Sequence, residues 1–240
     1  MGTVLVTGGA GFLGKHVVRS LADAGEQVVV TYRRYFQAPQ LFSDVMGSKI
    51  KAVRCDIMDL PELSRVIRDH GVDSIVNVAN ISNYEASIYQ CLQNNILGTI
   101  NVMEAAAIGS VKKVTYMSSS TIGAEDEIVP IASPAGGVVQ PSKKCAEVLS
   151  LYYGATFGIS VIVVRNAGNI WGTYGQSEIS QNAMKLLRDI MEGVTTGKPV
   201  DLPDVSKDRQ FRLTHVRDLA DGISVVHLAP RNQHLVYCVA

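Results

Sequence analysis

Thr7-Gly8-Gly9-Ala10-Gly11-Phe12-Leu13-Gly14 is the stretch of sequence that decides the fold. An apolar, β-branched run at residues 3–7 leads into it, which is typical of a buried strand. The segment that follows, residues 12–24, has its apolar positions at helical spacing and ends at Gly25. The chain is therefore predicted to open with a strand, a tight glycine turn and a helix.

The three glycines of this turn follow the spacing G-x-x-G-x-x-G, and each has a physical use there. Gly8 permits the tight turn, Gly11 lets the backbone approach a pyrophosphate, and Gly14 allows helix and strand to pack closely. The helix beginning at Phe12 and Leu13 then offers unpaired N–H groups and a positive dipole end to the phosphates. An ordinary glycine-rich loop is the alternative, but the position between the first strand and the first helix favours a dinucleotide site.

Strand-like and helix-like segments alternate along the chain, which predicts an α/β fold with a doubly wound parallel sheet, the Rossmann fold. The strand runs are nearly continuous in Val and Ile, as strands covered on both faces require. We predict a dinucleotide-binding domain at residues 1–166 and a smaller substrate-side region at 167–240 that partly rejoins the sheet. The strands are predicted at 3–7, 27–32, 50–55, 74–78, 113–117, 160–164 and 234–239. The helices are predicted at 12–24, 59–70, 83–108, 142–157, 178–193 and 215–228.

Composition limits the possible partners. The 240 residues carry 22 basic and 22 acidic side chains, so net charge gives no reason to expect nucleic acid or an anionic membrane as partner. No apolar run approaches the length of a membrane span, and a secretory leader is not expected. The four cysteines lack disulfide or metal spacing, so we expect buried thiols, no metal and a cytoplasmic location.

The end of the second predicted strand bears on the choice of cofactor. An NAD-preferring site usually has an acidic residue there for the adenosine ribose hydroxyls, whereas this chain has Tyr32 followed by Arg33 and Arg34. A guanidinium can pair with a 2′-phosphate through two hydrogen bonds. The sequence therefore favours NADP over NAD, with two solvated arginines opening a loop as the alternative.

Several further motifs resemble the extended short-chain dehydrogenase/reductase family, the NAD(P)-dependent epimerase/dehydratase group. Cys55-Asp56-Ile57-Met58-Asp59 looks like the third-strand motif of that family, and the resemblance implies that Asp56 and Ile57 face the adenine. Val78-Ala79-Asn80 takes the place of the fourth-strand end, so Ala79 and Asn80 are expected beside the cofactor. Asn95-Ile-Leu-Gly98-Thr99 is similar to the long helix of the family, which gives Asn95 a structural and proton-relay role.

The catalytic group of this family is Ser or Thr, Tyr and Lys, with Tyr four residues before Lys. Met117-Ser118-Ser119-Ser120 resembles its serine motif, with Ser119 the best match and Ser120 next, near the substrate. Lys143 matches the lysine, but Val139 stands where the tyrosine is expected, and no tyrosine occurs between Tyr116 and Tyr152. Valine cannot transfer a proton. General acid–base catalysis typically raises a reaction rate by ~10²–10⁴-fold, so its loss would slow the reaction severely unless another group takes over. Lys143 either takes over the proton transfer, if its ammonium is desolvated, or only binds the nicotinamide ribose.

The resemblance also gives expectations for the substrate side. Asn169 falls in a segment similar to the start of the family's substrate region, and Arg209 or Arg212 could hold an anionic substrate group. Family members usually continue for several tens of residues beyond the last predicted strand, whereas this chain stops at Ala240. We therefore expect a pocket that is smaller, more open or completed by another subunit.

Two functions follow from these observations. The first is an NADP(H)-binding enzyme of the epimerase/dehydratase or reductase type that acts on a small polar metabolite, such as a sugar or nucleotide-sugar, with proton transfer reassigned or the step non-redox. The second is an inactive dinucleotide-binding pseudo-enzyme that serves as sensor or scaffold. The resemblance further implies a homodimer through the helices near 83–108 and 142–157.

Overall fold

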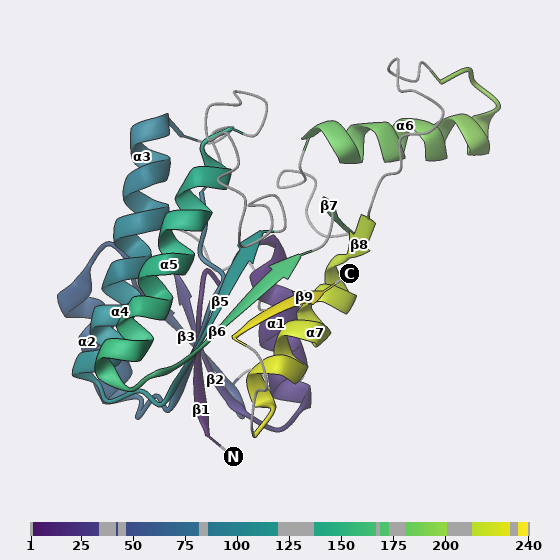
Figure 1. Cartoon of the computed structure of the whole chain (residues 1–240). Helices are drawn as coiled ribbons and strands as arrows, with labels where there is room; N and C mark the ends of the chain where they lie inside the picture. Colours follow the sequence, from purple (N-terminus) through teal and green to yellow (C-terminus); the bar gives the residue numbers. More distant parts are fainter. Residues whose placement is uncertain are drawn as a thin grey trace.

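The computed structural model of the chain describes residues 2–33, 42, 47–81, 86–119, 137–166, 169–172, 181–200, 213–230 and 235–239. Seven strands in this described part form one parallel sheet, in the order β3-β2-β1-β4-β5-β6-β9 (Figure 1). The strands are β1 (Thr3–Thr7), β2 (Gln27–Tyr32), β3 (Ile50–Arg54), β4 (Ser74–Asn77), β5 (Lys113–Ser119), β6 (Ser160–Asn166) and β9 (Val236–Val239). The predicted doubly wound α/β fold is confirmed.

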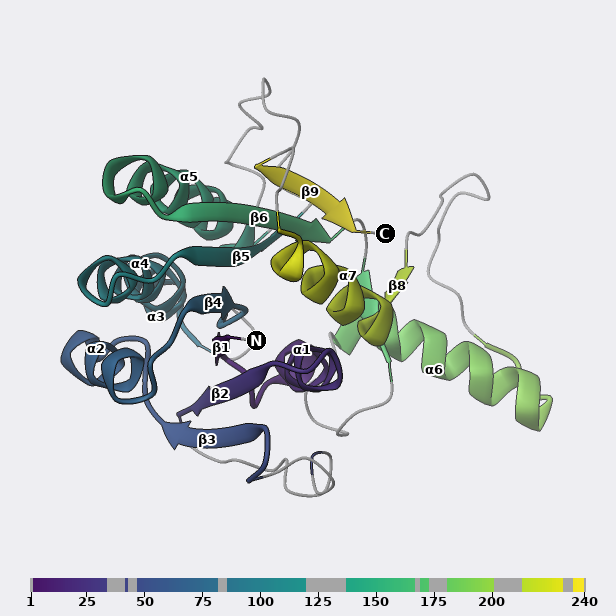
Figure 2. The ribbon, with the colours of Figure 1, turned by 90° about the horizontal axis from the view of Figure 1, so that it is seen from below.

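Helices cover both faces of the sheet, as Figure 2 shows. On one face α1 (Phe12–Asp23) packs against α7 (Val216–Leu228). On the other, α4 (Gly98–Ile108) lies between α2 (Leu60–Asp69) and α5 (Val139–Phe157). Most apolar strand residues fall into two buried clusters on opposite faces, one centred on Val4, Val6 and Leu21, the other on Leu5, Ile75 and Val114. A third, small cluster joins Tyr116 on β5 and Val163 on β6 to α5. Burial on both faces explains why the strands are almost continuous runs of Val and Ile.

The helix predicted at 83–108 is not a single regular helix. The structure has a short α3 (Ile88–Leu92), a π-helical segment η1 (Gln93–Leu97) and then α4. Ser87 and Gln90 form a reciprocal capping box that begins α3. The π-helical turns contain Asn95, and such irregular turns frequently occur at functional sites.

The region after residue 166 contributes both to the sheet and to a separate part of the structure. β9 pairs in parallel with β6 and becomes an edge of the sheet. β7 (Asn169–Trp171) and β8 (Leu213–His215) pair only with each other, and α6 (Gln181–Thr196) extends away from the sheet (Figure 1). The division into domains at residue 166 stays a prediction.

The expectation of four buried cysteines is wrong for two of them. Cys55 and Cys91 are buried, whereas Cys145 on α5 and Cys238 on β9 are exposed because their positions face outward from the helix and the edge strand. All four are free thiols. Within the ranges that the structure describes, no helix is long and apolar enough to cross a lipid bilayer.

Candidate functional site: the glycine turn and the carboxyl edge of the sheet

The glycine turn joins β1 to α1 at the carboxyl edge of the sheet. Gly8 has a φ of +70°, and a Cβ there would lie 2.7 Å from the Cα of Ala79, which follows β4. A Cβ on Gly14 would overlap the carbonyl oxygen of Gly8. These two glycines are therefore required by the left-handed backbone and by the close packing of turn, strand and helix.

Gly11 is less crowded than Gly8 and Gly14 by the residues that the structure describes. Among the described residues, a Cβ on Gly11 would have one atom within 4 Å, the Gly8 carbonyl oxygen at 3.1 Å, and the φ of −77° at Gly11 is open to any residue. Gly11 is also the N-cap of α1, where no side chain caps the helix and no acidic residue occupies the first turn. The N–H groups of Phe12 and Leu13 at this end fit an anionic group such as a pyrophosphate.

The turn lies where the direction of the winding changes. β1 pairs with β2 on one side and with β4 on the other, and the helices that follow β1 and β4 cover opposite faces of the sheet (Figure 2). In open α/β sheets, ligands bind at the carboxyl ends of the strands at this switch point. The residues present thus fit a dinucleotide, whose phosphates would lie on the α1 N-terminus.

Arg33 and Arg54 lie together on the β2 side of the turn. Arg33 is exposed directly after β2, and Arg54, opposite Tyr32 in the β2–β3 register, donates from Nε to the Arg33 carbonyl at 3.4 Å. Arg34 lies outside the described residues. Two guanidinium-bearing residues therefore share this strand end.

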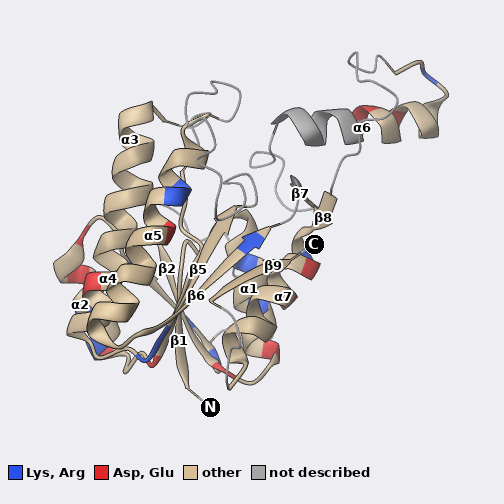
Figure 3. Ribbon diagram, in the orientation of Figure 1, with Lys and Arg blue, Asp and Glu red and all other residues tan. Residues whose placement is uncertain are grey.

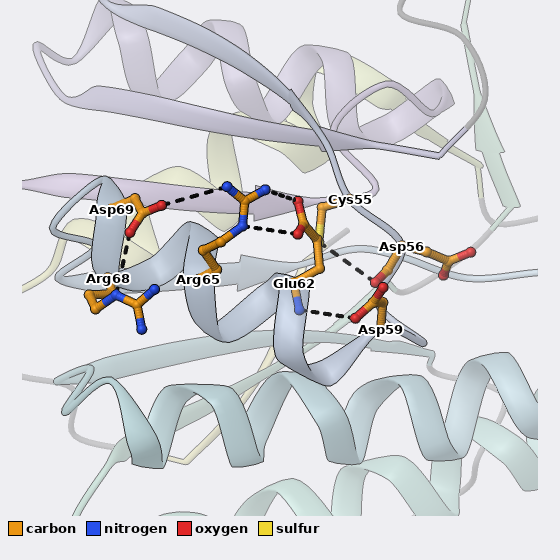
Figure 4. Close-up of polar contacts among 7 residues, drawn as sticks. All are labelled: Cys55, Asp56, Asp59, Glu62, Arg65, Arg68 and Asp69. Carbon is orange, nitrogen blue, oxygen red and sulfur yellow. Dashed lines mark hydrogen bonds and ion pairs between the residues drawn. The ribbon is translucent and has the colours of Figure 1, made fainter.

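The loop after β3 brings the predicted adenine contacts to the same edge. Asp56 accepts a hydrogen bond from the backbone N–H of Met58 at 3.0 Å, whereas Asp59 caps α2 by accepting from the Glu62 N–H at 3.0 Å. Figure 4 shows the two carboxylates directed apart, so they do not form a paired acid site. Ile57 is buried against α4, where a Cβ on Gly98 would overlap its side chain.

The segment that follows β4 passes beside both the glycine turn and the π-helical segment. Ala79 contacts Gly8, and Asn80 comes next along the chain. Ile81 is held by Asn95, whose Oδ1 accepts from the Ile81 N–H and whose Nδ2 donates to the Ile81 carbonyl, both at 2.9 Å. The structure therefore brings three predicted residues, Ala79, Asn80 and Asn95, to one place.

Lys143 is buried beside the end of β5. Its Nζ donates to the Met117 carbonyl at 2.6 Å and lies 5.0 Å from the centre of the Tyr116 ring. Burial lowers the pKa of this ammonium to about 7, because the charged form loses its hydration. Ser119 ends β5 two residues after Met117, while Ser120 lies outside the described residues.

Val139 is the first residue of α5 and belongs to a hydrogen-bonded chain from Asn95. The Asn95 Nδ2 donates to Ser142 Oγ at 3.1 Å, and Ser142 Oγ donates to the Val139 carbonyl at 2.9 Å. The backbone at the position expected for a tyrosine is thus tied to the predicted relay residue, although its side chain carries no acid or base.

A buried ion pair next to Lys143 was missed by the sequence reasoning. Glu147 on α5 pairs with Arg165 on β6 through both of its oxygens, and Ser118 Oγ donates to Glu147 Oε2 at 2.7 Å. The spacing of Lys143 and Glu147, four residues apart on one helix, placed both on one face and was the available signal. Arg165 gave no such signal, because its contact with Glu147 depends on how α5 packs on β6.

The predicted substrate contacts remain predictions. Asn169 begins β7, but its side chain is outside the described part of the structure, as are Arg209 and Arg212.

Comparison with known proteins adds to this geometry. The sequence model of a family described as the NAD dependent epimerase/dehydratase family matches residues 4–240. The UDP-glucose 4-epimerase of Yersinia enterocolitica is 28% identical, over 92% of this chain and 72% of that protein.

Solved structures of similar proteins share the fold. The dTDP-glucose 4,6-dehydratase of Bacillus anthracis in complex with NAD has a TM-score of 0.75 at 23% identity, over 100% of this chain and 75% of that one. The UDP-glucose 4-epimerase of Thermus thermophilus in complex with NAD has a TM-score of 0.72 at 23% identity, over 99% and 77%.

Proposed function

The chain belongs to the NAD dependent epimerase/dehydratase family, and from this premise we propose that it is an NADP(H)-binding enzyme acting on a small polar metabolite such as a nucleotide-sugar. One observation carries the proposal: the N-terminus of α1, which no side chain caps and whose N-cap residue is Gly11, lies at the switch point of the sheet. The likeness to UDP-glucose 4-epimerase over most of the chain supports the substrate class.

The glycine turn, Phe12 and Leu13 would hold the cofactor's phosphates, and Asp56 and Ile57 would face its adenine. A bound nicotinamide ring supplies hydride transfer to or from a carbon of the substrate. Ala79 and Asn80 would line the cofactor on the β4 side, where the contact between Gly8 and Ala79 fixes their distance from the turn.

Proton transfer is the step in which this chain departs from the family pattern. We assign it to Lys143, because the lowered pKa, about 7, lets the amine both accept and donate a proton near neutral pH. Ser119 would hydrogen-bond the reacting oxygen of the substrate. Asn95, which reaches the first turn of α5 through Ser142, would support this group as a relay residue.

The preference for NADP rests on charge at the end of β2. Arg33 is exposed there, Arg34 follows it in sequence, and Arg54 bonds to the Arg33 carbonyl. A 2′-phosphate at this place would meet guanidinium groups, and neither Tyr32 nor the two residues after it is acidic.

Calorimetric titration with NADP, NADPH, NAD and NADH tests the cofactor assignment directly. We expect NADP(H) to bind at least tenfold more tightly than NAD(H), and the preference to fall when both Arg33 and Arg34 are changed to Gln. Tighter binding of NAD(H) by the parent protein would overturn the preference, and no binding of either at millimolar concentration would overturn the assignment as a whole.

A second candidate, a pseudo-enzyme that binds the dinucleotide as sensor or scaffold, is favoured by Val139. Restoring the phenol separates the two. Conversion of nucleotide-sugars and carbonyl compounds is followed both as NADPH oxidation and as product formation, because epimerisation and dehydration consume no NADPH; if it occurs only in Val139→Tyr, the pseudo-enzyme is supported. Turnover by the parent protein that Lys143→Met abolishes supports the reassigned enzyme.

We further propose that the protein is cytoplasmic, with its thiols reduced, and that it forms a homodimer through α3, α4 and α5. The dimer is supported by a set of large apolar side chains that are exposed on these helices and on η1. They are Ile88, Tyr89, Leu97, Ile108, Val148, Tyr152 and Phe157, all at least 47% exposed. Sedimentation should give a dimer for the parent protein and a monomer for Tyr89→Lys combined with Tyr152→Lys; a monomeric parent would contradict the proposal.

A further inference from the structure

Asn77, the last residue of β4, lies at the centre of a buried hydrogen-bond network that the sequence reasoning did not single out. The residue is 1% exposed, and its side-chain amide has partners on both sides. Its Oδ1 accepts from the hydroxyl of Thr7 at 2.7 Å and from the N–H of Ala79 at 3.3 Å. Its Nδ2 lies 3.5 Å from the hydroxyl oxygen of Thr99, to which it donates.

These partners belong to three different parts of the proposed site. Thr7 is the residue before Gly8 and lies opposite Asn77 in the parallel register of β1 and β4. Ala79 is the residue against which Gly8 packs. Thr99 is in the first turns of α4, and its hydroxyl donates to the carbonyl of Asn95 at 2.7 Å. One amide thus joins the glycine turn, the segment after β4 and the helix that carries Asn95.

The segment at residues 78–81 is consequently fixed at both ends. At its start, Asn77 holds the N–H of Ala79, and the N–H of Val78 donates to the Thr7 carbonyl at 3.2 Å. At its end, the Asn95 amide holds both backbone groups of Ile81. Buried polar groups that lose one partner carry the full cost of desolvation, so a change at Asn77 would leave the Thr7 hydroxyl and the Ala79 N–H unsatisfied.

We propose that Asn77 is a positioning residue for dinucleotide binding, which holds residues 78–81 against the glycine turn and joins them to Asn95 through Thr99. The proposal rests on the proposed function in one respect, namely that the glycine turn binds a dinucleotide. Asn77 itself is buried beneath the turn and acts through its neighbours. Binding groups need support of this kind to stay within about 0.5 Å of their productive positions.

The main test compares Asn77→Leu with Thr115→Val, a variant that also removes a buried hydrogen bond from the sheet. The Thr115 hydroxyl is fully buried and bonds to His227 at 2.8 Å, away from the turn. Calorimetry with NADP and NAD and the thermal midpoint without dinucleotide are measured for both variants. We expect Asn77→Leu to weaken binding of the preferred dinucleotide at least tenfold and Thr115→Val to weaken it less than twofold. This difference should hold whichever of the two variants loses more thermal stability. Equal weakening by the two, or binding by Asn77→Leu within twofold of the parent protein, would overturn the proposal.

Amide hydrogen exchange on the dinucleotide-free protein tests the positioning independently of binding. Asn77→Leu should raise the exchange rates of Ala79 and Ile81 at least tenfold, while Thr115→Val leaves both unchanged. Unchanged rates in Asn77→Leu contradict the inference, whether or not the parent protein binds a dinucleotide. A parent protein that binds none refutes the proposed function, and the positioning of residues 78–81 is then decided by exchange alone.

If Asn77→Leu does not fold, two variants of Thr7 test whether the hydrogen bond between Thr7 and Asn77 supports dinucleotide binding. Thr7→Val removes only the hydroxyl that donates to Asn77 and keeps the side-chain size, whereas Thr7→Ser keeps the hydroxyl. We expect at least threefold weaker dinucleotide binding and faster exchange at Ala79 in Thr7→Val, with Thr7→Ser within twofold of the parent protein in both. Parent-like behaviour of both variants would overturn the proposal.

Discussion

The Nζ atom of Lys143 lies 2.6 Å from the carbonyl oxygen of Met117, in a place where the lysine is only 5% exposed. A neutral amine can also donate an N–H to this carbonyl, in a weaker hydrogen bond than an ammonium makes but without the cost of burying a charge. The end of β5 therefore offers Lys143 a partner that does not require it to be protonated. The same bond connects α5 to the strand that carries Ser119.

The first prediction concerns the pH dependence that follows from this burial. The pKa of Lys143 falls from its ordinary value of 10.5 to about 7 in the folded protein. Between these two values the unfolded chain holds a proton that the folded protein does not, so stability rises with pH through this window and is lost as pH falls towards 7. Urea unfolding at pH 6–10 measures this effect in the parent protein and in Lys143→Met. The free energy of unfolding of the parent protein should rise with pH by on the order of a few kcal/mol, and this rise should be absent in the variant.

Lys144→Met is the matched control, because Lys144 is the more exposed neighbour on the same helix. It should keep the parent's rise in stability. The same slope in Lys143→Met and in the parent protein would show that Lys143 is protonated when buried, and would remove the basis for assigning it the proton transfer.

His227 gives the second prediction, at the acid end of the pH range. Its ring bridges Ser74 Oγ on β4 at 2.9 Å and Thr115 Oγ1 on β5 at 2.8 Å, and burial lowers its pKa from 6.5 to about 3. Between pH 6.5 and about pH 3, His227 is protonated in the unfolded chain but neutral in the folded protein. The contribution of this residue to stability is therefore complete above pH 6.5 and is lost as pH falls towards 3. Chemical unfolding at pH 4 and pH 7.5 should show a smaller acid loss for His227→Gln than for the parent protein. His70→Gln, at a less buried histidine, should behave nearly as the parent does; equal acid loss in all three would contradict the prediction.

The third prediction concerns the buried pair of Glu147 and Arg165, whose side chains are 4% and 9% exposed. Removal of one partner leaves an uncompensated buried charge, which typically costs about 3–5 kcal/mol. Arg165→Met should therefore lower the free energy of unfolding by about this amount, and Arg165→Met combined with Glu147→Leu should recover most of it. The exposed pair of Arg65 and Glu62 (Figure 4) is the control, because Arg65→Met should leave the free energy of unfolding nearly unchanged in this solvent-screened position. The pair belongs to α2, which is labelled in Figure 3. A double variant no more stable than Arg165→Met would show that the site cannot repack around apolar side chains.

The parallel sheet and the glycine turn could be predicted from sequence because their signals are local. The strands are short β-branched runs, and the turn needs Gly8, Gly11 and Gly14 at fixed spacing within one strand–helix unit. The resemblance to a family added Asn95 and Lys143, which the structure brings to the same edge of the sheet. These residues are recognisable without knowledge of which strands are neighbours.

The networks that support the site could not be predicted, because each depends on strand pairing or helix packing between distant residues. Thr7 and Asn77 are 70 positions apart and meet only through the β1–β4 register. Glu147 meets Arg165 only because α5 packs on β5 and β6. The π-helical turns at Gln93–Leu97 were missed for another reason: the apolar periodicity of an α-helix continues on both sides of them.

The last prediction separates the two roles of glycine in the turn. Gly11→Ala should still fold, with a smaller loss of stability than Gly14→Ala, because its φ of −77° suits alanine and the contact of the added Cβ among the described residues is the Gly8 carbonyl oxygen at 3.1 Å, which would have to shift by a few tenths of an ångström. The same methyl group would occupy the space through which a pyrophosphate approaches the Phe12 and Leu13 N–H groups, so dinucleotide affinity should fall at least tenfold. Gly14→Ala should instead fail to fold or lose several kcal/mol, since its Cβ would overlap the Gly8 carbonyl oxygen and the Gly9 backbone. Thermal unfolding and calorimetry on both variants distinguish the cases: parent-like binding by Gly11→Ala would mean that the phosphates do not lie over this residue, and the α1 N-terminus would lose its assigned ligand.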